Sequence, residues 1–163
     1  MQTLMPLANE VAQRLRARKE TVAIAESSTG GLISAALLAV PGASAYFTGG
    51  AVAYTRASKE RFVGITKDDY KQARAATEKH ALTMAQRIRG QLGATWGLGE
   101  TGAAGPGGNS YGDPAGHTCI GIVGPGQRAK MLNTGSTDRV ENMELFAAAA
   151  LELFRDVLDA QGR

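Results

Sequence analysis

The chain has 163 residues with one cysteine and a formal net charge of +3, and it is 44% hydrophobic, 20% charged and 6% aromatic. The length favours one domain, residues 1–163, with the composition of an ordinary soluble protein. The lone cysteine excludes an internal disulfide, and no apolar run reaches the ~18 residues of a membrane span. With few aromatic residues for stacking on bases, we expect a cytoplasmic protein that binds neither membranes nor nucleic acid directly.

Helical and extended patterns alternate along the chain, with Gly and Pro at their boundaries. Thr55 and Thr77 stand where N-caps of two helices are expected. In chain order, the pattern predicts a helix over 4–17, a strand over 21–25, a helix over 32–39, a strand over 51–54, a short helix around 59–63, a helix over 78–91, a strand over 94–98, a long loop over 100–116, strands over 118–123 and 128–133, and a helix over 139–160.

Strands that alternate with helices predict an α/β fold, here a three-layer α/β/α sandwich. The last two strands are joined by the hairpin-like Gly124-Pro125-Gly126. A hairpin joins antiparallel strands, so one strand should run against the others. The sequence therefore predicts a mixed, mostly parallel five-stranded sheet.

The turn Glu26–Gly31 joins the first strand to the second helix. Open α/β sheets bind ligands outside the carboxyl ends of their strands, and free N–H groups at a helix start suit a phosphate or an oxyanion. A serine in this turn can attack a carbonyl carbon, but Ser and Thr are also favoured helix caps. Physical reasoning from the sequence does not separate Ser27 from Ser28.

A nucleophilic serine needs a base, and the end of the next strand offers one. Neither His80 nor His117 has a clear Ser/His/Asp context. Lysine can replace histidine when it is neutral, which requires burial or a nearby cation. Lys59 lies close in sequence to Tyr54 and is the candidate, with a solvated helix residue as the alternative.

A glycine-rich stretch from Thr101 to Asn109 is either a substrate loop or a mobile surface loop. Just before it, Gly97-Leu98-Gly99-Glu100-Thr101-Gly102 matches G-x-G-x-x-G. That fingerprint must open a helix, and the following glycines and Pro106 cannot start one. Cys119 lies in an apolar run and is expected to be buried. Two distant histidines and one cysteine form no convincing metal cluster.

Four ordered motifs together resemble the CinA C-terminal domain family, and the resemblance covers nearly the whole chain. The family pattern is A-E-S-C-T-G-G, then Y-S-N-x-x-K, then T/S-G-I-A-G-P-x-G-G, then P-V-G-T-V. The corresponding segments here are Ala25-Glu26-Ser27-Ser28-Thr29-Gly30-Gly31, Tyr54-Thr55-Arg56-Ala57-Ser58-Lys59, Thr101-Gly102-Ala103-Ala104-Gly105-Pro106-Gly107-Gly108-Asn109 and Pro114-Ala115-Gly116-His117-Thr118.

The resemblance implies hydrolysis of the carboxamide of nicotinamide mononucleotide to nicotinate mononucleotide and ammonia, by a cytoplasmic homodimer without metal or cofactor. The family's serine, lysine and tyrosine correspond to Ser27, Lys59 and Tyr54. In this hypothesis the serine forms an acyl-enzyme, and neutral lysine moves the proton directly or through tyrosine. The residues expected to bind substrate come from the turn, the loop and the last helix: Ser28, Thr29, Gly30, Gly31, Thr101, Gly102, Ala103, Ala104, Gly105 and Arg139.

This chain also departs from the family pattern. Ser28 replaces Cys, Arg56 replaces Asn, and Met143 stands where a second arginine is frequent. Two other functions are alternatives. One is a pyridine-nucleotide sensor without catalysis, in a pocket that these changes have altered. The other, which the historical name of the family suggests, is an interaction protein in DNA uptake or damage responses.

Overall fold

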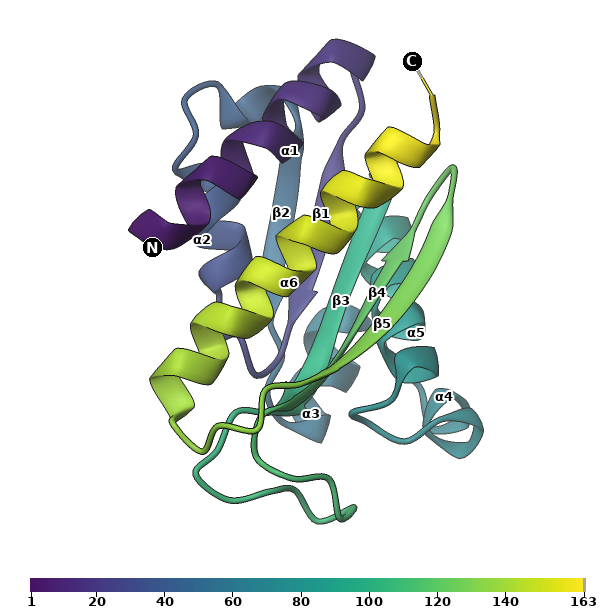
Figure 1. Ribbon diagram of the computed structural model, residues 1–163. Coiled ribbons are helices and arrows are strands. Elements are labelled where there is room, and N and C mark those ends of the chain that lie inside the picture. Colours follow the sequence, from purple (N-terminus) through teal and green to yellow (C-terminus); the bar gives the residue numbers. More distant parts are fainter. Residues whose placement is uncertain (163) are drawn as a thin grey trace.

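The computed structural model describes residues 1–162. A five-stranded sheet in the order β2-β1-β3-β4-β5 lies between two layers of helices (Figure 1). The strands are β1 (Val22–Glu26), β2 (Phe47–Val52), β3 (Trp96–Ala103), β4 (His117–Val123) and β5 (Gln127–Asn133).

The predicted fold class is confirmed. β1 pairs in parallel with β2 and β3, whereas β4 runs antiparallel to both β3 and β5. Among the strands that the structure describes, β4 is therefore the one antiparallel strand, as the hairpin at 124–126 predicts.

Six α-helices are present in the described residues, together with short turns of other helix types. The α-helices are α1 (Met5–Arg18), α2 (Leu32–Leu38), α3 (Arg56–Ser58), α4 (Lys67–Gln72), α5 (Glu78–Leu92) and α6 (Arg139–Ala160). The short turns are the 3-10 turns η1 (Gln2–Leu4) and η2 (Ala43–Ala45) and the π-type turn η3 (Lys59–Val63). No helix within residues 1–162 combines the length and the apolar character needed to cross a bilayer.

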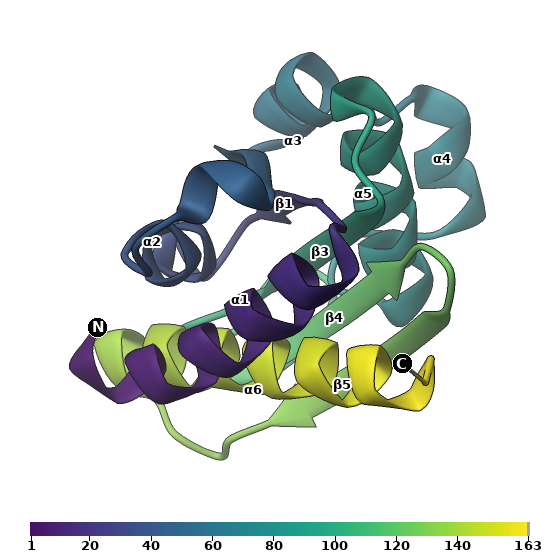
Figure 2. The ribbon, with the colours of Figure 1, turned by 90° about the horizontal axis from the view of Figure 1, so that it is seen from above.

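The two faces of the sheet carry different cores. α1, α2 and α6 cover one face (Figure 2). Trp96 and Phe154 pack edge to face in this core, with ring centroids 5.7 Å apart. α3, α4 and α5 cover the other face, whose buried residues are mostly small, with Met84 and Ile88 of α5 among the larger ones. The small residues allow α5 to lie close against the sheet.

Two glycines of the apparent nucleotide fingerprint explain this close approach. Gly97 and Gly99 lie inside β3, and a Cβ at either position would overlap the backbone carbonyl of Ala85 or Ala81 in α5. They open no helix, so the rejection of a dinucleotide fingerprint is confirmed.

Two strands are longer than the sequence predicts, and one helix was not predicted. β2 begins at Phe47, because Gly49 and Gly50 pair with β1 although they look like turn residues. β3 continues to Ala103, because the glycine-rich segment keeps pairing with β4. The prediction missed α4, a short polar helix that begins with a capping box between Thr66 and Asp69. The predicted N-caps Thr55 and Thr77 are confirmed.

Candidate active site

A cavity of about 310 Å³ lies where β1, β2 and β3 end. Ser27 directly follows β1, and Tyr54 lies two residues beyond β2. Because the carboxyl ends of parallel strands meet at one edge of the sheet, residues far apart in sequence converge there. The cavity is lined by Ser27, Tyr54, Arg56, Lys59, Tyr70, Ala75, Ala76, Thr101, Gly102, Asn109 and Tyr111. The structure thus brings together the three residues expected to be catalytic.

Lys59 is held in place by the turn before it. The Thr55 hydroxyl accepts a hydrogen bond from the Ser58 N–H, and the Lys59 N–H donates to the Thr55 carbonyl at 3.0 Å. The Lys59 residue is only 5% exposed. Burial lowers the pKa of its amine from the ordinary lysine value, while the nearby charge of Glu100 opposes this shift. The lysine is therefore neutral at a lower pH than an exposed lysine, as a general base requires.

A buried carboxylate, Glu26, caps α2 from inside the protein. Its Oε2 accepts the N–H groups of Gly31 and Ile33 at 3.0 and 3.1 Å, and its Oε1 accepts the N–H and the hydroxyl of Ser34, both at 2.7 Å. The Thr29 hydroxyl lies 2.7 Å from the same Oε2. Glu26 is fully buried, so these donors replace the water that a carboxylate would otherwise bind.

A second buried carboxylate, Glu100 of β3, lies beneath the turn. Its Oε2 accepts the N–H groups of Ser27 and Thr29, each at 3.0 Å, and lies 2.9 Å from the Thr29 hydroxyl. Its Oε1 accepts the hydroxyls of Ser28 and, at 2.8 Å, of Thr118. One fully buried side chain thus ties the turn to β3 and β4.

The two carboxylates correct one sequence-based expectation. We expected free N–H groups at the start of α2 to form an anion site. Instead Glu26 and Glu100 occupy five of them, and the N–H of Gly30 donates to the carbonyl of Ser27. From 27 to 34, only the Ser28 N–H has no acceptor among the described residues. The helix start is therefore already filled by anionic groups of the protein itself.

The environments of the two adjacent serines differ. The Ser28 hydroxyl donates to Glu100 and does not reach the cavity lining. Ser27 lines the cavity together with Lys59, and its hydroxyl has no hydrogen-bond partner among residues 1–162. Ser27 is thus the serine whose hydroxyl is available to a ligand.

Only some of the residues expected to bind substrate line the cavity. Thr101 and Gly102 line the cavity, whereas the other turn and loop residues named for this role do not. Arg139, at the start of α6, donates to the carbonyl of Gly105 and, at 3.3 Å, to the Tyr54 hydroxyl. It therefore links the loop to Tyr54 at the rim of the cavity.

An ion pair anchors the long loop after β3. Arg74 donates to both carboxylate oxygens of Asp113, at 2.7 and 3.0 Å, and lowers the pKa of that carboxyl to about 2. Asp113 also accepts a hydrogen bond from Asn109 at 2.8 Å, and the Arg74 guanidinium lies 4.9 Å from the centre of the Tyr111 ring. The loop is thus fixed with Asn109 and Tyr111 against the cavity.

Ala76 forms part of the cavity wall in an unusual backbone conformation, with φ of 59°. Its N–H donates to the Thr101 hydroxyl at 3.1 Å, and its carbonyl accepts from His117 Nε2 at 2.9 Å. A residue other than glycine persists in this left-handed region when its surroundings hold it there, often near functional sites. His117 thus supports the wall and does not enter the cavity.

The other two candidates for acid–base or nucleophilic chemistry are buried. Burial lowers the pKa of His80 to about 4, so the ring is neutral near pH 7. Burial raises the pKa of Cys119 to about 12, which leaves the thiol protonated and unreactive. The prediction that Cys119 is a buried residue is confirmed. Within residues 1–162, no group of three or more His, Cys, Asp or Glu side chains is arranged to hold a metal ion.

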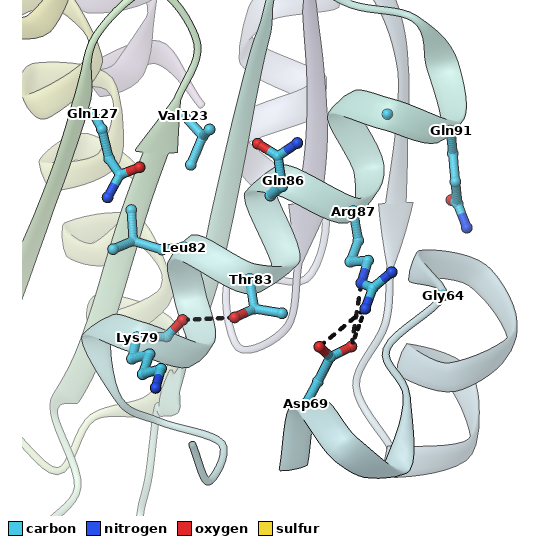
Figure 3. Close-up of a pocket in the computed structure, with 11 residues that line it drawn as sticks. Gly64, Asp69, Lys79, Leu82, Thr83, Gln86, Arg87, Gln91, Val123 and Gln127 are labelled. Atoms are coloured by element: carbon cyan, nitrogen blue, oxygen red, sulfur yellow. Dashed lines mark hydrogen bonds and ion pairs between the residues drawn. The ribbon is translucent and has the colours of Figure 1, made fainter. Parts of the chain in front are cut away.

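A second depression, of about 760 Å³, lies on the outer face of α5 (Figure 3). Arg87 of α5 forms an ion pair with Asp69 of α4 there, at 2.9 Å. The Thr83 hydroxyl donates to the carbonyl of Lys79 at 2.9 Å. These groups satisfy one another, and no serine or cysteine is among the residues lining this depression.

Sequence reasoning missed Glu100, Tyr70 and Tyr111. The signal for Glu100 was a single acidic residue at the end of a buried strand, between glycines taken for a nucleotide fingerprint. Tyr70 lies on the unpredicted α4, and Tyr111 lies in the loop. Neither tyrosine carries a recognisable motif.

Fold and cavity together define a mixed α/β sandwich in which a serine, a lysine and a tyrosine meet at the carboxyl edge of the sheet. The family model of the CinA C-terminal domain matches residues 4–158, and the chain belongs to this family. A CinA-like protein of Desulforapulum autotrophicum is 39% identical over 97% of this chain, and one of Myxococcus xanthus is 42% identical over 91%. The aligned region spans only 38% and 35% of these two relatives.

The fold likeness extends to solved structures of similar length. The competence damage-inducible protein A of Klebsiella pneumoniae superposes with a TM-score of 0.90 at 26% identity, covering 98% of each chain.

Proposed function

We propose that the protein is an amidohydrolase that converts nicotinamide mononucleotide to nicotinate mononucleotide and ammonia. The observation that carries the proposal is the pairing of Ser27 with the buried, pKa-lowered Lys59 in one cavity. A module that only binds nucleotides needs no such base. The family resemblance supplies the substrate.

The proposed reaction begins when Ser27 Oγ attacks the carboxamide carbon while neutral Lys59 accepts the serine proton, directly or through Tyr54. The C–N bond then breaks, and the lysine proton passes to the leaving nitrogen, which departs as ammonia. Water next attacks the acyl-enzyme, and Lys59 takes a proton from it and returns this proton to Ser27 Oγ as the ester bond breaks. The products are the acid, which loses its proton to solvent and leaves as the carboxylate, and free Ser27 with neutral Lys59.

The same proposal assigns the oxyanion donors. Since Glu26 and Glu100 occupy the neighbouring amides, the Ser28 N–H is the turn amide left for a developing oxyanion. A nucleophile followed directly by an oxyanion donor is the arrangement that α/β-hydrolases use. Losing one such donor typically costs about 10²–10³-fold in kcat.

Gly102 offers a second donor. Trp96 of β3 donates its N–H to Thr21, so alternate residues of β3 direct their amides toward β1. The β1–β3 pairing ends at Ala25 and Gly99, and therefore the Gly102 amide faces no strand. Gly102 lines the cavity, where such an amide meets a ligand.

The test is ammonia release from nicotinamide mononucleotide by the purified protein, with nicotinate mononucleotide measured in parallel. We expect equal amounts of the two products, and no turnover by Ser27→Ala or Lys59→Ala. Turnover that survives Ser27→Ala rejects the mechanism. Saturable binding of the nucleotide without ammonia release rejects the amidase and favours the sensor. The homodimeric state and the lack of direct nucleic-acid binding stay predictions.

A further inference from the structure

The Glu100 side chain has more polar contacts than its place in a strand requires. It is fully buried, and five N–H or O–H groups lie within hydrogen-bonding distance of it. Four of the five belong to the turn 27–29, which holds the candidate nucleophile. A strand residue that served only the sheet would pack an apolar side chain at this position.

We propose that Glu100 is a positioning residue for the Ser27 site, which clamps the nucleophile turn and sets the charge environment of Lys59. This inference rests on the proposed amidase for its kinetic consequences only. The clamp and the charge interaction concern the protein without substrate.

The clamp follows from the order of the contacts along the turn. Glu100 accepts the backbone N–H groups on both sides of Ser28 and also the Ser28 hydroxyl. Ser28 is therefore fixed by its side chain and by both neighbours, while its own N–H stays without an acceptor among the described residues. Such fixing orients the Ser28 N–H before substrate arrives, which is how oxyanion donors act efficiently.

The charge interaction follows from burial. Lys59 and Glu100 lie on different elements, η3 and β3, and both are nearly or fully excluded from solvent. Screening by water is weak at such positions, so the carboxylate favours the charged form of the lysine and raises its pKa against the lowering by burial. The other ionisable groups around Lys59 are Tyr54, Arg56, Tyr70 and Tyr111 of the cavity and His80 of α5.

The two carboxylate oxygens of Glu100 have different partners, so one substitution can remove the charge and keep the hydrogen bonds. Oε2 accepts two backbone N–H groups, which can only donate, whereas Oε1 contacts the hydroxyls of Ser28 and Thr118, which can also accept. In Glu100→Gln the amide oxygen can occupy the Oε2 position, and the NH₂ group can donate to the two hydroxyls. We therefore expect this variant to fold, to keep the clamp and to lose the charge.

The experiment titrates the Lys59 amine by NMR in ¹³C-lysine-labelled protein without substrate, with the resonance identified by its loss in Lys59→Arg. We expect Glu100→Gln to move this titration to lower pH. The exposed Glu152→Gln, a charge removal on α6 at the opposite face of the sheet, should leave the titration unchanged because water screens that position. An unchanged titration in folded Glu100→Gln overturns the proposal.

A second variant covers the case in which Glu100→Gln does not fold. Thr118→Val keeps the side-chain shape and removes one hydroxyl that offsets the Glu100 charge, so the Lys59 titration should move to higher pH. No movement overturns the proposal.

The kinetic measurement separates the two proposals. In an active amidase, the acidic limb of kcat/KM should move in the same directions as the titration, a change that a merely structural role would not cause. Protein with no amidase activity but with the expected titration shifts retains the Glu100 proposal and rejects the amidase. Amidase activity without the expected titration shifts retains the amidase and rejects the Glu100 proposal.

Discussion

Substituting each of the two adjacent serines in turn should separate stability from activity. The buried Ser28 hydroxyl donates to the Glu100 carboxylate, and a hydrogen bond to a charged group contributes about 1.5–3 kcal/mol. In Ser28→Ala the carboxylate keeps its other contacts, so no charge is left unpaired. For a chain of this length that loss corresponds to a fall in Tm of about 3–12 °C.

Ser27→Ala should behave in the opposite way. Ser27 is 4% exposed, but its hydroxyl has no hydrogen-bond partner among residues 1–162. Ser27→Ala therefore breaks no hydrogen bond and leaves no group unpaired, so the stability change should be about 0.5 kcal/mol or less. Removing a nucleophile should lower kcat by about 10⁴-fold or more.

Thermal unfolding and ammonia release, measured on both variants at one pH, test this pair of predictions. Ser28→Ala should keep most of its turnover at a temperature where it is folded. If folded Ser28→Ala lost activity as completely as Ser27→Ala, the assignment of the two hydroxyls from their environments would be wrong.

Three further predictions concern pH, the loop and the packing of α5. Because burial lowers the Lys59 pKa, kcat/KM should rise with pH along a limb that lies below the range of ordinary lysines, and a limb at or above that range contradicts a buried base. Asp113→Asn should lower the stability of the folded protein by about 1 kcal/mol at pH 7. Because the pKa of Asp113 is lowered to about 2, the stabilisation by its carboxylate is complete above about pH 4. The difference in Tm between the variant and the unchanged protein should therefore disappear as pH falls through 2. Gly99→Ala would place a Cβ against α5 and should lower the free energy of unfolding by about 1–3 kcal/mol. Gly90→Ala has open space around it and should raise the free energy of unfolding by about 1 kcal/mol. Chemical denaturation of both variants measures these changes.

The sequence predicted the fold well where local patterns carry the signal. Long amphipathic helices and apolar strands were found because burial imposes their periodicity, and α6 was placed at its observed bounds, 139–160. The predicted strand boundaries were wrong where glycine residues pair within the sheet. Gly49 and Gly50 of β2 pair with a neighbour, and strand pairing is a long-range property that a local pattern does not show.

The candidate site was predictable in its residues but not in its chemistry. Family motifs named Ser27, Tyr54 and Lys59, and one cavity contains all three. What separates Ser27 from Ser28 is the position of Glu100, which lies 72 residues from Ser28 along the chain. Only the folded sheet brings that carboxylate beneath the turn. For the same reason, the sequence of the turn alone does not indicate that its backbone N–H groups already donate to Glu26 and Glu100.

The internal cap of α2 has a consequence for how the product leaves. Helix starts commonly hold anions, but here Glu26 already neutralises the positive end of the helix. In the proposed reaction a neutral amide becomes an anionic acid at Ser27, in the turn that leads into α2. The newly formed acid finds no attractive dipole at that position, whereas a vacant helix start would retain it. In the proposed reaction, the carboxylate that completes the helix therefore disfavours retention of the acid product at this position.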